Sequence, residues 1–530
     1  MSKFRILVAD DLSPEGLEIL EKAGEVEVRQ GMAEQELRDA LPSCDALIVR
    51  SATHVTARVL EAADTLTVIG RAGIGVDNID VEAATERGIV VMNTPEAGAV
   101  TTGELAVALM MCLARNISAA DASMKAGKWE KSALLGTELK GRVLGVLGLG
   151  RIGSVVADRG CGLQMQVIAH DPYVDQSRVP AGVRLVTFEE LLQQSDFLSV
   201  HVPKSNDTLG LIGAAEIAKM KEGARIINGA RGGIVDESAL CDALDAGRLG
   251  GAALDVFERE PLPEDNRLRH TQRLILTPHL GASTREAKRN VSREMARQVV
   301  KCLRTGVVLN GINVPRIAPA EAAQVGPFLR LAHNLAAFLA QVFPGEMHSL
   351  RITLQGDLLS ASAHPLQVSA LAGALQHRAE GPVTPVNAEN IAQRMGVRWH
   401  TESHALKRDF VNLIRVEALL GEERHFVSGT VLGHRHGRMV ELDRFLLDAI
   451  PEGPMLVTFH EDQPGVVGQI GQILGDARIN ISRVQLGSAE NGGDGDVQMG
   501  ILNLSSPLGA RPLKRIQDLP SIRRACAVNG

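Results

Sequence analysis

The stretch VLGVLGLGRIG at residues 143–153 decides the fold of the central part of this 530-residue chain. Its first five residues predict a buried strand, and the glycines that follow have the spacing G-x-G-x-x-G and open a helical pattern. Gly148 permits a tight turn, Gly150 lets the backbone approach a pyrophosphate, and Gly153 allows a helix to pack closely on the strand. With the positive N-terminus of that helix, the stretch predicts a dinucleotide-binding turn. The alternative is a glycine-rich turn that holds no nucleotide.

Asp171 indicates which dinucleotide this turn would hold. It follows the next expected strand, where a carboxylate can bind the ribose hydroxyls of the adenosine. The same carboxylate would repel the 2′-phosphate of NADP. We therefore expect NAD as the cofactor.

Short apolar runs alternate with helical patterns on both sides of this turn. In the central block the expected strands are Val143–Leu147, Gln166–His170, Phe197–Val200, Arg225–Asn228, Gly251–Asp255 and Leu274–Leu276. In the first third they are Ile6–Ala9, Val26–Val28, Ala46–Val49, Val68–Gly70 and Ile89–Met92. One long helix is expected over Thr102–Ala126, and another over Ser283–Arg304 returns the chain toward the first block. This α/β alternation predicts parallel sheets covered by helices, with the central sheet doubly wound.

Three charged side chains, Arg231, Glu260 and His279, each follow the end of an expected strand of the central block. Ligands of an open parallel sheet bind outside the carboxyl ends of its strands, so the three should meet beside the nucleotide. The alternatives are a surface salt bridge between Arg231 and Glu260, and an ordinary loop histidine.

These residue types suit the oxidation of a small 2-hydroxy acid. His279 can accept the hydroxyl proton, because imidazole titrates near neutral pH. Glu260 would fix its tautomer and favour the imidazolium form. Arg231 offers a planar fork for the substrate carboxylate. Asp255 would accept a hydrogen bond from the nicotinamide carboxamide or ribose and so orient the ring.

Composition excludes several other classes of function. The net charge of −7 provides no basic field for nucleic acid or an anionic membrane. The six cysteines form no C-x-x-C pair, which argues against a disulfide framework and a structural zinc, and we expect no metal. The chain begins without a signal-peptide pattern, and its most apolar run, Leu105–Ala114, is too short to span a bilayer. We expect a cytoplasmic protein.

The last 80 residues or so predict a separate unit. The pattern gives strand Met455–His460, helix Gly465–Ala477, strands Ile479–Leu486 and Asp496–Leu504, helix Ala510–Asp518 and strand Ile522–Val528. This βαββαβ order is typical of a ferredoxin-like domain. Residues 317 to about 450 predict a mixed α/β module whose topology the sequence leaves open.

The first 315 residues resemble the D-isomer-specific 2-hydroxy acid dehydrogenase family. The matching segments are the glycine-rich turn, Gly70-Arg-Ala-Gly-Ile-Gly-Val-Asp-Asn78, Ala230-Arg-Gly-Gly-Ile-Val-Asp-Glu237, Ala253-Leu-Asp-Val-Phe257 and Pro278-His-Leu-Gly-Ala-Ser-Thr284. The whole chain resembles the long form within this family, which has an intervening allosteric domain and a C-terminal ACT domain. The resemblance implies a flavodoxin-like substrate domain (1–100 and 284–315), an NAD-binding Rossmann domain inserted in it (101–283), an intervening domain (316–452) and a ferredoxin-like ACT domain (453–530).

The resemblance also implies an activity, NAD-dependent oxidation of D-3-phosphoglycerate to 3-phosphohydroxypyruvate, the first step of the phosphorylated route to L-serine. Arg231, Glu260 and His279 fall on the family's catalytic positions. The cofactor positions are Gly148, Gly150, Arg151, Ile152, Gly153, Asp171, Gly229, Ala230, Arg231, Asp255, His279, Gly281 and Ala282. The substrate positions are Arg50, Ser51, Arg71, Gly73 and Ile74, where the arginines suit a phosphate dianion; solvated arginines are the alternative.

The C-terminal unit points to regulation. Asp462, before a helix, and Asn480, opening the next strand, resemble the amino-acid-binding signature of ACT domains, which implies L-serine as effector at a dimer interface. The alternative is a purely structural dimerisation unit, and a homodimer or homotetramer is expected in either case. The cationic turn His434–Arg438 is interpreted as solvated, with an anion pocket as the alternative.

Two rival functions stay open at this point. One is another dehydrogenase of the family, reducing hydroxypyruvate, glyoxylate or 2-oxoglutarate, although the two additional C-terminal domains argue against it. The other is an NAD-sensing corepressor that binds partner proteins, which the acidic net charge disfavours.

Overall fold

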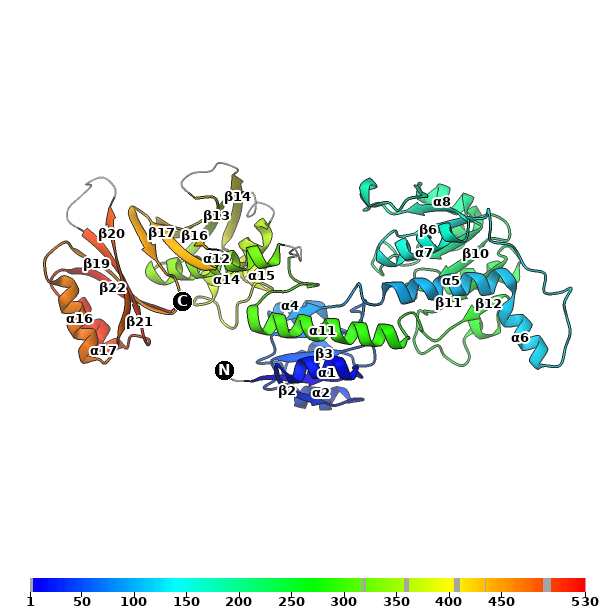
Figure 1. Cartoon of the computed structure of the whole chain (residues 1–530), viewed down its shortest axis with the longest axis horizontal. Helices are drawn as coiled ribbons and strands as arrows, with labels where there is room; N and C mark the ends of the chain where they lie inside the picture. Colours follow the sequence, from blue (N-terminus) through cyan, green and yellow to red (C-terminus); the bar gives the residue numbers. More distant parts are fainter. Residues whose placement is uncertain are drawn as a thin grey trace.

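The computed structural model consists of three parts that follow one another along its long axis (Figure 1). A five-stranded and a seven-stranded parallel unit lie side by side, and a ten-stranded sheet forms the C-terminal part. The structure describes residues 3–315, 317, 321–356, 362–404, 410–433, 435–489 and 497–529.

The five-stranded unit, called the substrate domain after the role that the sequence predicts for it, has the strand order β2-β1-β3-β4-β5 with all strands parallel, which is flavodoxin-like as expected. Central β3 is an uninterrupted apolar run buried on both faces. In edge strand β2, by contrast, exposed glutamates alternate with glycine and valine. The strands are β1 (Phe4–Val8), β2 (Gly24–Val28), β3 (Ala46–Val49), β4 (Val68–Arg71) and β5 (Val90–Met92). Its helices are α1 (Pro14–Glu21), α2 (Glu34–Ala40), α3 (Ala57–Leu60) and α4 (Val81–Glu86).

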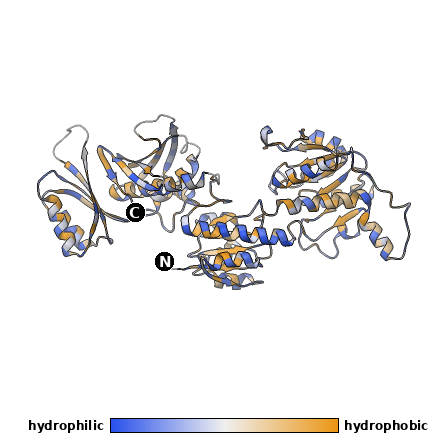
Figure 2. Ribbon diagram, in the orientation of Figure 1, coloured by the Kyte–Doolittle hydropathy of each residue, from blue (hydrophilic) through white to orange (hydrophobic). Residues whose placement is uncertain are grey.

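Helix α11 (Arg285–Thr305) returns to this sheet after the seven-stranded unit. Thr284 caps its start by accepting a hydrogen bond from the Ala287 N–H, and Gly306, with a φ of 69°, ends it. Met295 packs against β4 at Gly70, and it comes so close that a side chain at position 70 would collide with it. Figure 2 shows apolar and hydrophilic residues alternating along α11, as expected for a helix with one face on a sheet.

The seven-stranded unit, the nucleotide-binding domain, has the order β12-β11-β10-β9-β6-β7-β8 and is doubly wound as expected. The strands are β6 (Val143–Leu147), β7 (Gln166–His170), β8 (Val183–Leu185), β9 (Phe197–Val200), β10 (Arg225–Asn228), β11 (Gly251–Leu254) and β12 (Leu274–Leu276). Strand β8 had no counterpart among the expected strands. The helices are α7 (Arg151–Gly162), α8 (Phe188–Gln194), α9 (Ala214–Lys219) and α10 (Glu237–Asp245), with 3₁₀ turns η1 (Gln176–Arg178) and η2 (Arg267–His270).

The single helix expected over Thr102–Ala126 is wrong. The structure has two helices, α5 (Ala99–Arg115) and α6 (Ile117–Lys125), at an angle of 63°. Asn116 separates them with a φ of 52°, a left-handed conformation that asparagine tolerates better than most residues. In the described part of the chain no single helix is long and apolar enough to cross a membrane, although this bent pair passes by length and composition.

The intervening domain supplies one end of the ten-stranded sheet. Its strands are β13 (Met347–Gln355), β14 (Arg398–His404), β15 (Leu413–Leu420), β16 (Glu423–Leu432), β17 (His436–Leu442) and β18 (Phe445–Ala449). The neighbouring helices are α12 (Ala322–Val342), α14 (Ala363–Leu375) and α15 (Ala388–Arg394). Strand β13 pairs parallel with β14 and antiparallel with β15, so the sheet is mixed.

The C-terminal unit has the expected βαββαβ order. Its elements are β19 (Pro454–Glu461), α16 (Val466–Asp476), β20 (Ile481–Ala489), β21 (Val497–Leu504), α17 (Ala510–Gln517) and β22 (Ile522–Asn529). They form the ferredoxin-like sheet order β22-β19-β21-β20. Strand β20 also pairs with β18, which joins this sheet to that of the intervening domain.

Candidate active site

A cleft of about 460 Å³ lies between the substrate domain and the nucleotide-binding domain. The loops at the carboxyl ends of β3, β4, β10 and β12 form its walls, as an open parallel sheet requires. Of the expected site residues, the cleft is lined by Arg50, Ser51, Arg71, Gly73, Ile74, Ile152, Gly229, Ala230, Arg231, His279, Gly281 and Ala282.

His279 and Glu260 form a close pair, with 2.6 Å between His279 Nδ1 and Glu260 Oε2. Burial raises the pKa of Glu260, but hydrogen bonds from His279 and the Phe257 N–H, with the charges of His279 and Arg231, outweigh it and hold that pKa below its usual value. Glu260 therefore stays ionised and can stabilise a positive charge on His279. Because Nδ1 is occupied, Nε2 is the ring nitrogen left for a ligand.

Asp255 holds the loop that carries His279. It is fully buried and accepts hydrogen bonds from the Thr277 hydroxyl at 2.7 Å and from the Leu280 and Gly281 N–H groups at 2.7 and 2.9 Å. The backbone of His279 has a φ of 55°, which a non-glycine residue rarely adopts without such support. In this structure Asp255 thus fixes the loop, whereas the sequence suggested a contact with the nicotinamide.

Arg231 bridges the two domains. Its Nε donates to Oδ2 of Asp77 in the substrate domain at 2.9 Å, and its Nη1 donates to the Ala230 carbonyl at 2.7 Å. A side chain at Gly75 would collide with the guanidinium, so this approach needs glycine there. Asn228 shapes the loop by accepting from the Ala230 N–H and donating to the Arg231 carbonyl, each at 3.0 Å.

Arg50 and Arg71 bring further positive charge into the same cleft. Arg71 is largely buried, and its Nε has no hydrogen-bond partner among the described residues. Burial, with repulsion from Arg231 and Arg50, lowers the pKa of Arg71 to about 10. An anion in the cleft would relieve both the repulsion and the unsatisfied donor.

The glycines of the dinucleotide turn have three different surroundings. Gly148 has a φ of 90°, and a side chain there would contact the His201 carbonyl at 2.8 Å. A side chain at Gly153 would collide with the Gly148 carbonyl, so α7 can start this close to β6 only with glycine. Over Gly150 there is open space, which leaves room for a pyrophosphate at the start of α7.

Asp171 stands beside this turn. Its Oδ2 accepts from the Leu149 N–H at 2.8 Å, and its Oδ1 accepts from the Tyr173 N–H at 2.9 Å. Arg151, at the first position of α7, has its Nη2 3.3 Å from Oε1 of Glu96, which lies between β5 and α5. The residues present therefore fit a dinucleotide: an open glycine turn, a helix N-terminus and a carboxylate after the second strand.

His201 is a lining residue that the sequence argument did not identify. Its Nε2 lies 2.8 Å from the Ser199 hydroxyl, and its buried Nδ1 has no partner among the described residues. Burial lowers the pKa of His201 to about 4, so the ring is neutral at physiological pH. Asp77 was also missed as a site residue, because nothing in the local sequence pairs it with Arg231.

The two expected effector residues do not meet within one chain. Asp462 follows the end of β19, and Asn480 precedes the start of β20. Both strands run antiparallel to β21, so they run parallel to each other and these residues lie at opposite ends of the sheet, roughly 30 Å apart at 3.3 Å per residue. Both residues are exposed.

His434 of the cationic turn lies outside the described residues. Among the residues that the structure describes, no group of three or more histidine, cysteine, aspartate or glutamate side chains has an arrangement that could hold a metal ion. All six cysteines are described and are unpaired.

Three regions of the chain match known families. Residues 107–281 match the D-isomer specific 2-hydroxyacid dehydrogenase NAD binding domain, and residues 324–443 match the D-3-phosphoglycerate dehydrogenase intervening domain. Residues 455–520 match the ACT domain.

Similar proteins include full-length relatives. A D-3-phosphoglycerate dehydrogenase of Synechocystis is 40% identical over 99% of this chain and 94% of its own length. One of Archaeoglobus fulgidus is 38% identical over 98% of both chains. Among solved structures, an NAD-dependent formate dehydrogenase of Staphylococcus aureus in complex with NAD has a TM-score of 0.52 at 27% identity, covering 57% of this chain and 97% of that one.

Proposed function

Because the chain belongs to the D-3-phosphoglycerate dehydrogenase branch of the D-isomer specific 2-hydroxyacid dehydrogenases, we propose that its cleft oxidises the C2 hydroxyl of D-3-phosphoglycerate to give 3-phosphohydroxypyruvate, the first step of the phosphorylated route to L-serine. The observation that carries the proposal is the set of three arginines, Arg50, Arg71 and Arg231, in the cleft that holds the His279–Glu260 pair. A substrate with one carboxylate and one phosphate dianion matches this excess of positive charge.

In this proposal His279 takes the hydroxyl proton through Nε2 as the C2–H bond breaks. Glu260 holds the ring by Nδ1 and stabilises the imidazolium that results. Arg231 exchanges its contact with Asp77 for the substrate carboxylate and polarises the C2 oxygen. NAD, when bound, supplies the nicotinamide ring that accepts the hydride.

Recognition of the phosphate falls to the substrate domain. Arg71 has an unsatisfied Nε and Arg50 lies at the end of the neighbouring strand, so both can donate to phosphate oxygens. Ser51, Gly73 and Ile74 line the same side of the cleft, where backbone N–H groups can meet the carboxylate.

We also propose NAD rather than NADP as the cofactor. The Asp171 carboxylate lies at the dinucleotide turn, where it would accept from the ribose hydroxyls and repel a 2′-phosphate. Arg151, Ile152, Gly229, Ala230, Gly281 and Ala282 would contribute the remaining surface of this site.

A second copy of the chain is part of the proposed working enzyme, as a homodimer or homotetramer. Large apolar side chains on and after α6 are exposed, namely Ile117, Met124, Trp129 and Leu135, at 50 to 89%. Asp462 and Asn480 lie at opposite ends of one sheet, so an L-serine site that uses both would take one from each copy. The six unpaired thiols favour a reducing compartment such as the cytoplasm.

The test is NADH formation with D-3-phosphoglycerate, D-glycerate and D-lactate, using NAD and NADP, with and without L-serine. We expect turnover with the phosphorylated acid and NAD, and inhibition by L-serine. Turnover on only the unphosphorylated acids, or NADH consumption with glyoxylate or 2-oxoglutarate but no turnover of D-3-phosphoglycerate, would instead identify another dehydrogenase of the family. No turnover with any acid would favour an NAD-sensing binding protein.

A further inference from the structure

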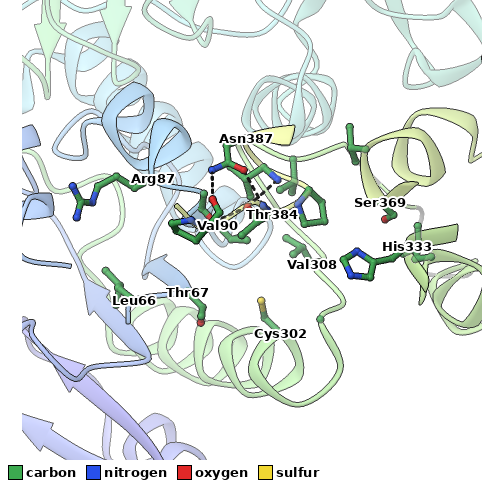
Figure 3. A pocket seen from close by; sticks show the side chains of 18 of the residues that line it. Leu66, Thr67, Arg87, Val90, Cys302, Val308, His333, Ser369, Thr384 and Asn387 are labelled. Atoms are coloured by element: carbon green, nitrogen blue, oxygen red, sulfur yellow. Dashed lines mark hydrogen bonds between the residues drawn. The ribbon is translucent and has the colours of Figure 1, made fainter. Parts of the chain in front are cut away.

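A second and larger cavity, of about 830 Å³, lies between the substrate domain and the intervening domain. The substrate domain contributes the segments before β3, β4 and β5 and the C-terminal end of α11, and the intervening domain contributes α12, α14 and the loop before α15 (Figure 3). This size is well within the range of small-molecule sites, which prefer interfaces between domains.

The interior of this cavity is apolar with a few uncharged polar groups. Its apolar walls include Leu66, Val90, Val308, Leu329, Val368 and Ile391. The Ser369 hydroxyl and the Cys302 thiol also lie on the cavity wall. The charged lining residues are Asp64, Glu86, Arg330, Glu380 and Arg394, which are exposed, and Asp45 and Arg87, which are half-buried. The Arg87 guanidinium is already held by the Glu61 carbonyl and by Asp64.

The environment inside the cavity disfavours charge. Burial raises the pKa of the Cys302 thiol to about 11 and lowers the pKa of His333, so both groups are neutral at physiological pH. A phosphate or carboxylate placed there would lose its hydration without gaining a buried cation. The cavity is therefore unsuited to the anions that the catalytic cleft favours.

Polar contacts hold the two domains together at one side of the cavity. The Thr384 hydroxyl donates to the Gly88 carbonyl at 2.9 Å, and the Asn387 amide donates to the Glu86 carbonyl at 3.4 Å (Figure 3). Gly88 has a φ of 73°, and a side chain there would contact the Thr384 hydroxyl at 2.7 Å. The cavity is thus bounded by a specific docking contact.

The cavity and the catalytic cleft lie at opposite ends of the same structural elements. Thr67 lines the cavity just before β4, and Arg71 lines the cleft at the end of β4. Asp45 and Arg50 flank β3 in the same way. Helix α11, roughly 30 Å long at 1.5 Å per residue, begins at the cleft and ends at the cavity.

We propose that this interdomain cavity binds a small molecule with an apolar body and an uncharged hydrogen-bonding group, and that its occupancy changes the affinity of the catalytic cleft for substrate. The apolar walls take the body, and Ser369 or Cys302 meets the polar group. Strands β3 and β4, which connect the cavity to the cleft, carry Arg50 and Arg71 at their ends, whereas His279 and Glu260 belong to the nucleotide-binding domain. Occupancy of the cavity should therefore change KM and leave kcat unchanged. This coupling rests on the proposed function, but binding at the cavity does not.

Binding is tested with a matched pair of fluorescent probes on the full chain. N-phenyl-1-naphthylamine has an apolar body and one uncharged N–H, and 8-anilinonaphthalene-1-sulfonate adds a sulfonate to the same rings. We expect saturable binding of the neutral probe, at least ~10-fold tighter than the sulfonate, the factor that corresponds to 1.4 kcal/mol. Equal or tighter binding of the sulfonate would overturn the assigned class of ligand.

Variants locate the probe. Ser369→Leu on α14 and Val386→Phe on the partly exposed loop each add volume to the cavity, and both should weaken the neutral probe at least ~10-fold. Ala218→Leu, on an exposed position of α9 outside the cavity, is the matched control and should change nothing. Circular dichroism and thermal melting check folding, and unchanged probe binding in both folded cavity variants would overturn the site.

Coupling is measured with D-3-phosphoglycerate. Saturating neutral probe should change its KM about fivefold or more with kcat unchanged, and by the reciprocity of binding free energies saturating substrate should change the probe affinity in the same direction. A probe that binds at the cavity without affecting KM would overturn the coupling. Probe binding is read without turnover, so an inactive enzyme would count against the proposed function alone.

Discussion

The catalytic cleft and the interdomain cavity lie against opposite edges of one five-stranded sheet, yet their chemistry is opposed. At the carboxyl ends of its strands lie Arg50 and Arg71, whose positive charges repel each other and would be stabilised by a bound anion. The amino edge faces a neutral thiol and a neutral imidazole. The contrast shows that the two ends of a parallel sheet can serve different purposes. Charged groups lie on the loops that follow the strands, and the segments that precede the strands pack on the next domain.

The largest expected difference between the two sites is in the chemical step. His279→Ala should lower kcat by at least ~10²-fold, the scale of a lost general base, with NADH binding largely intact. Ser369→Leu, in the cavity, should leave kcat unchanged. Steady-state kinetics and NADH fluorescence titration make the measurement, and a normal kcat in His279→Ala would remove His279 from this role.

The next largest expected difference between the two sites is in substrate affinity, which should depend on the cleft arginines. Arg71→Gln removes a buried charge and should raise KM for D-3-phosphoglycerate by roughly 10- to 100-fold, as expected for charge-assisted hydrogen bonds of about 1.5–3 kcal/mol. The effect on D-glycerate, which lacks the phosphate, should be clearly smaller. Equal effects on both acids would show that Arg71 does not contact the phosphate.

A smaller effect is expected where the domains meet across the cleft. Asp77→Ala frees the Arg231 guanidinium, which in the proposed mechanism must leave Asp77 to bind the substrate. Because Asp77 is 62% exposed the pair contributes at most about 1 kcal/mol, so KM should fall two- to fivefold. Asp77→Glu keeps the carboxylate and should change KM less. If kcat falls by the same factor while KM stays constant, Asp77 affects the transition state and not the positioning of Arg231 for binding.

Alkylation of the Cys302 thiol should have the smallest effect on turnover. Its pKa of about 11 means that the thiolate is scarce at neutral pH and that alkylation accelerates about tenfold per pH unit up to about pH 11. Iodoacetamide labelling, read by mass spectrometry, should be much slower in the native than in the unfolded chain at pH 7. The neutral probe should slow it further, and equal rates in native and unfolded protein would contradict the burial of Cys302.

The sequence predicted the nucleotide-binding domain closely, because central parallel strands are continuous apolar runs with glycine-rich turns after them. Strand β8 escaped notice because it has three residues, all of them at least partly exposed. The break between α5 and α6 depends on one left-handed residue, Asn116, inside a pattern that is otherwise helical on both sides.

The site was less predictable where contacts are distant in sequence. Arg231, Glu260 and His279 could be grouped because all follow strands of one sheet. The contact between Arg231 and Asp77 spans 154 positions and two domains, so no local pattern announces it. Asp255 was expected to meet the cofactor, but only coordinates reveal that both its oxygens hold the loop after β12.

The pairing of β18 with β20 has a mechanical consequence. The ACT and intervening domains also share a buried cluster that includes Phe338 of α12 and Met499 of β21, and Gln341 of α12 exchanges hydrogen bonds with Asn529 of β22. These contacts join the two domains through both backbone and core, and the Thr384 loop connects the joined unit to the substrate domain. A displacement of the C-terminal sheet would therefore be expected to move the intervening domain with it and to reach the substrate domain at the Thr384 contact, beside the interdomain cavity.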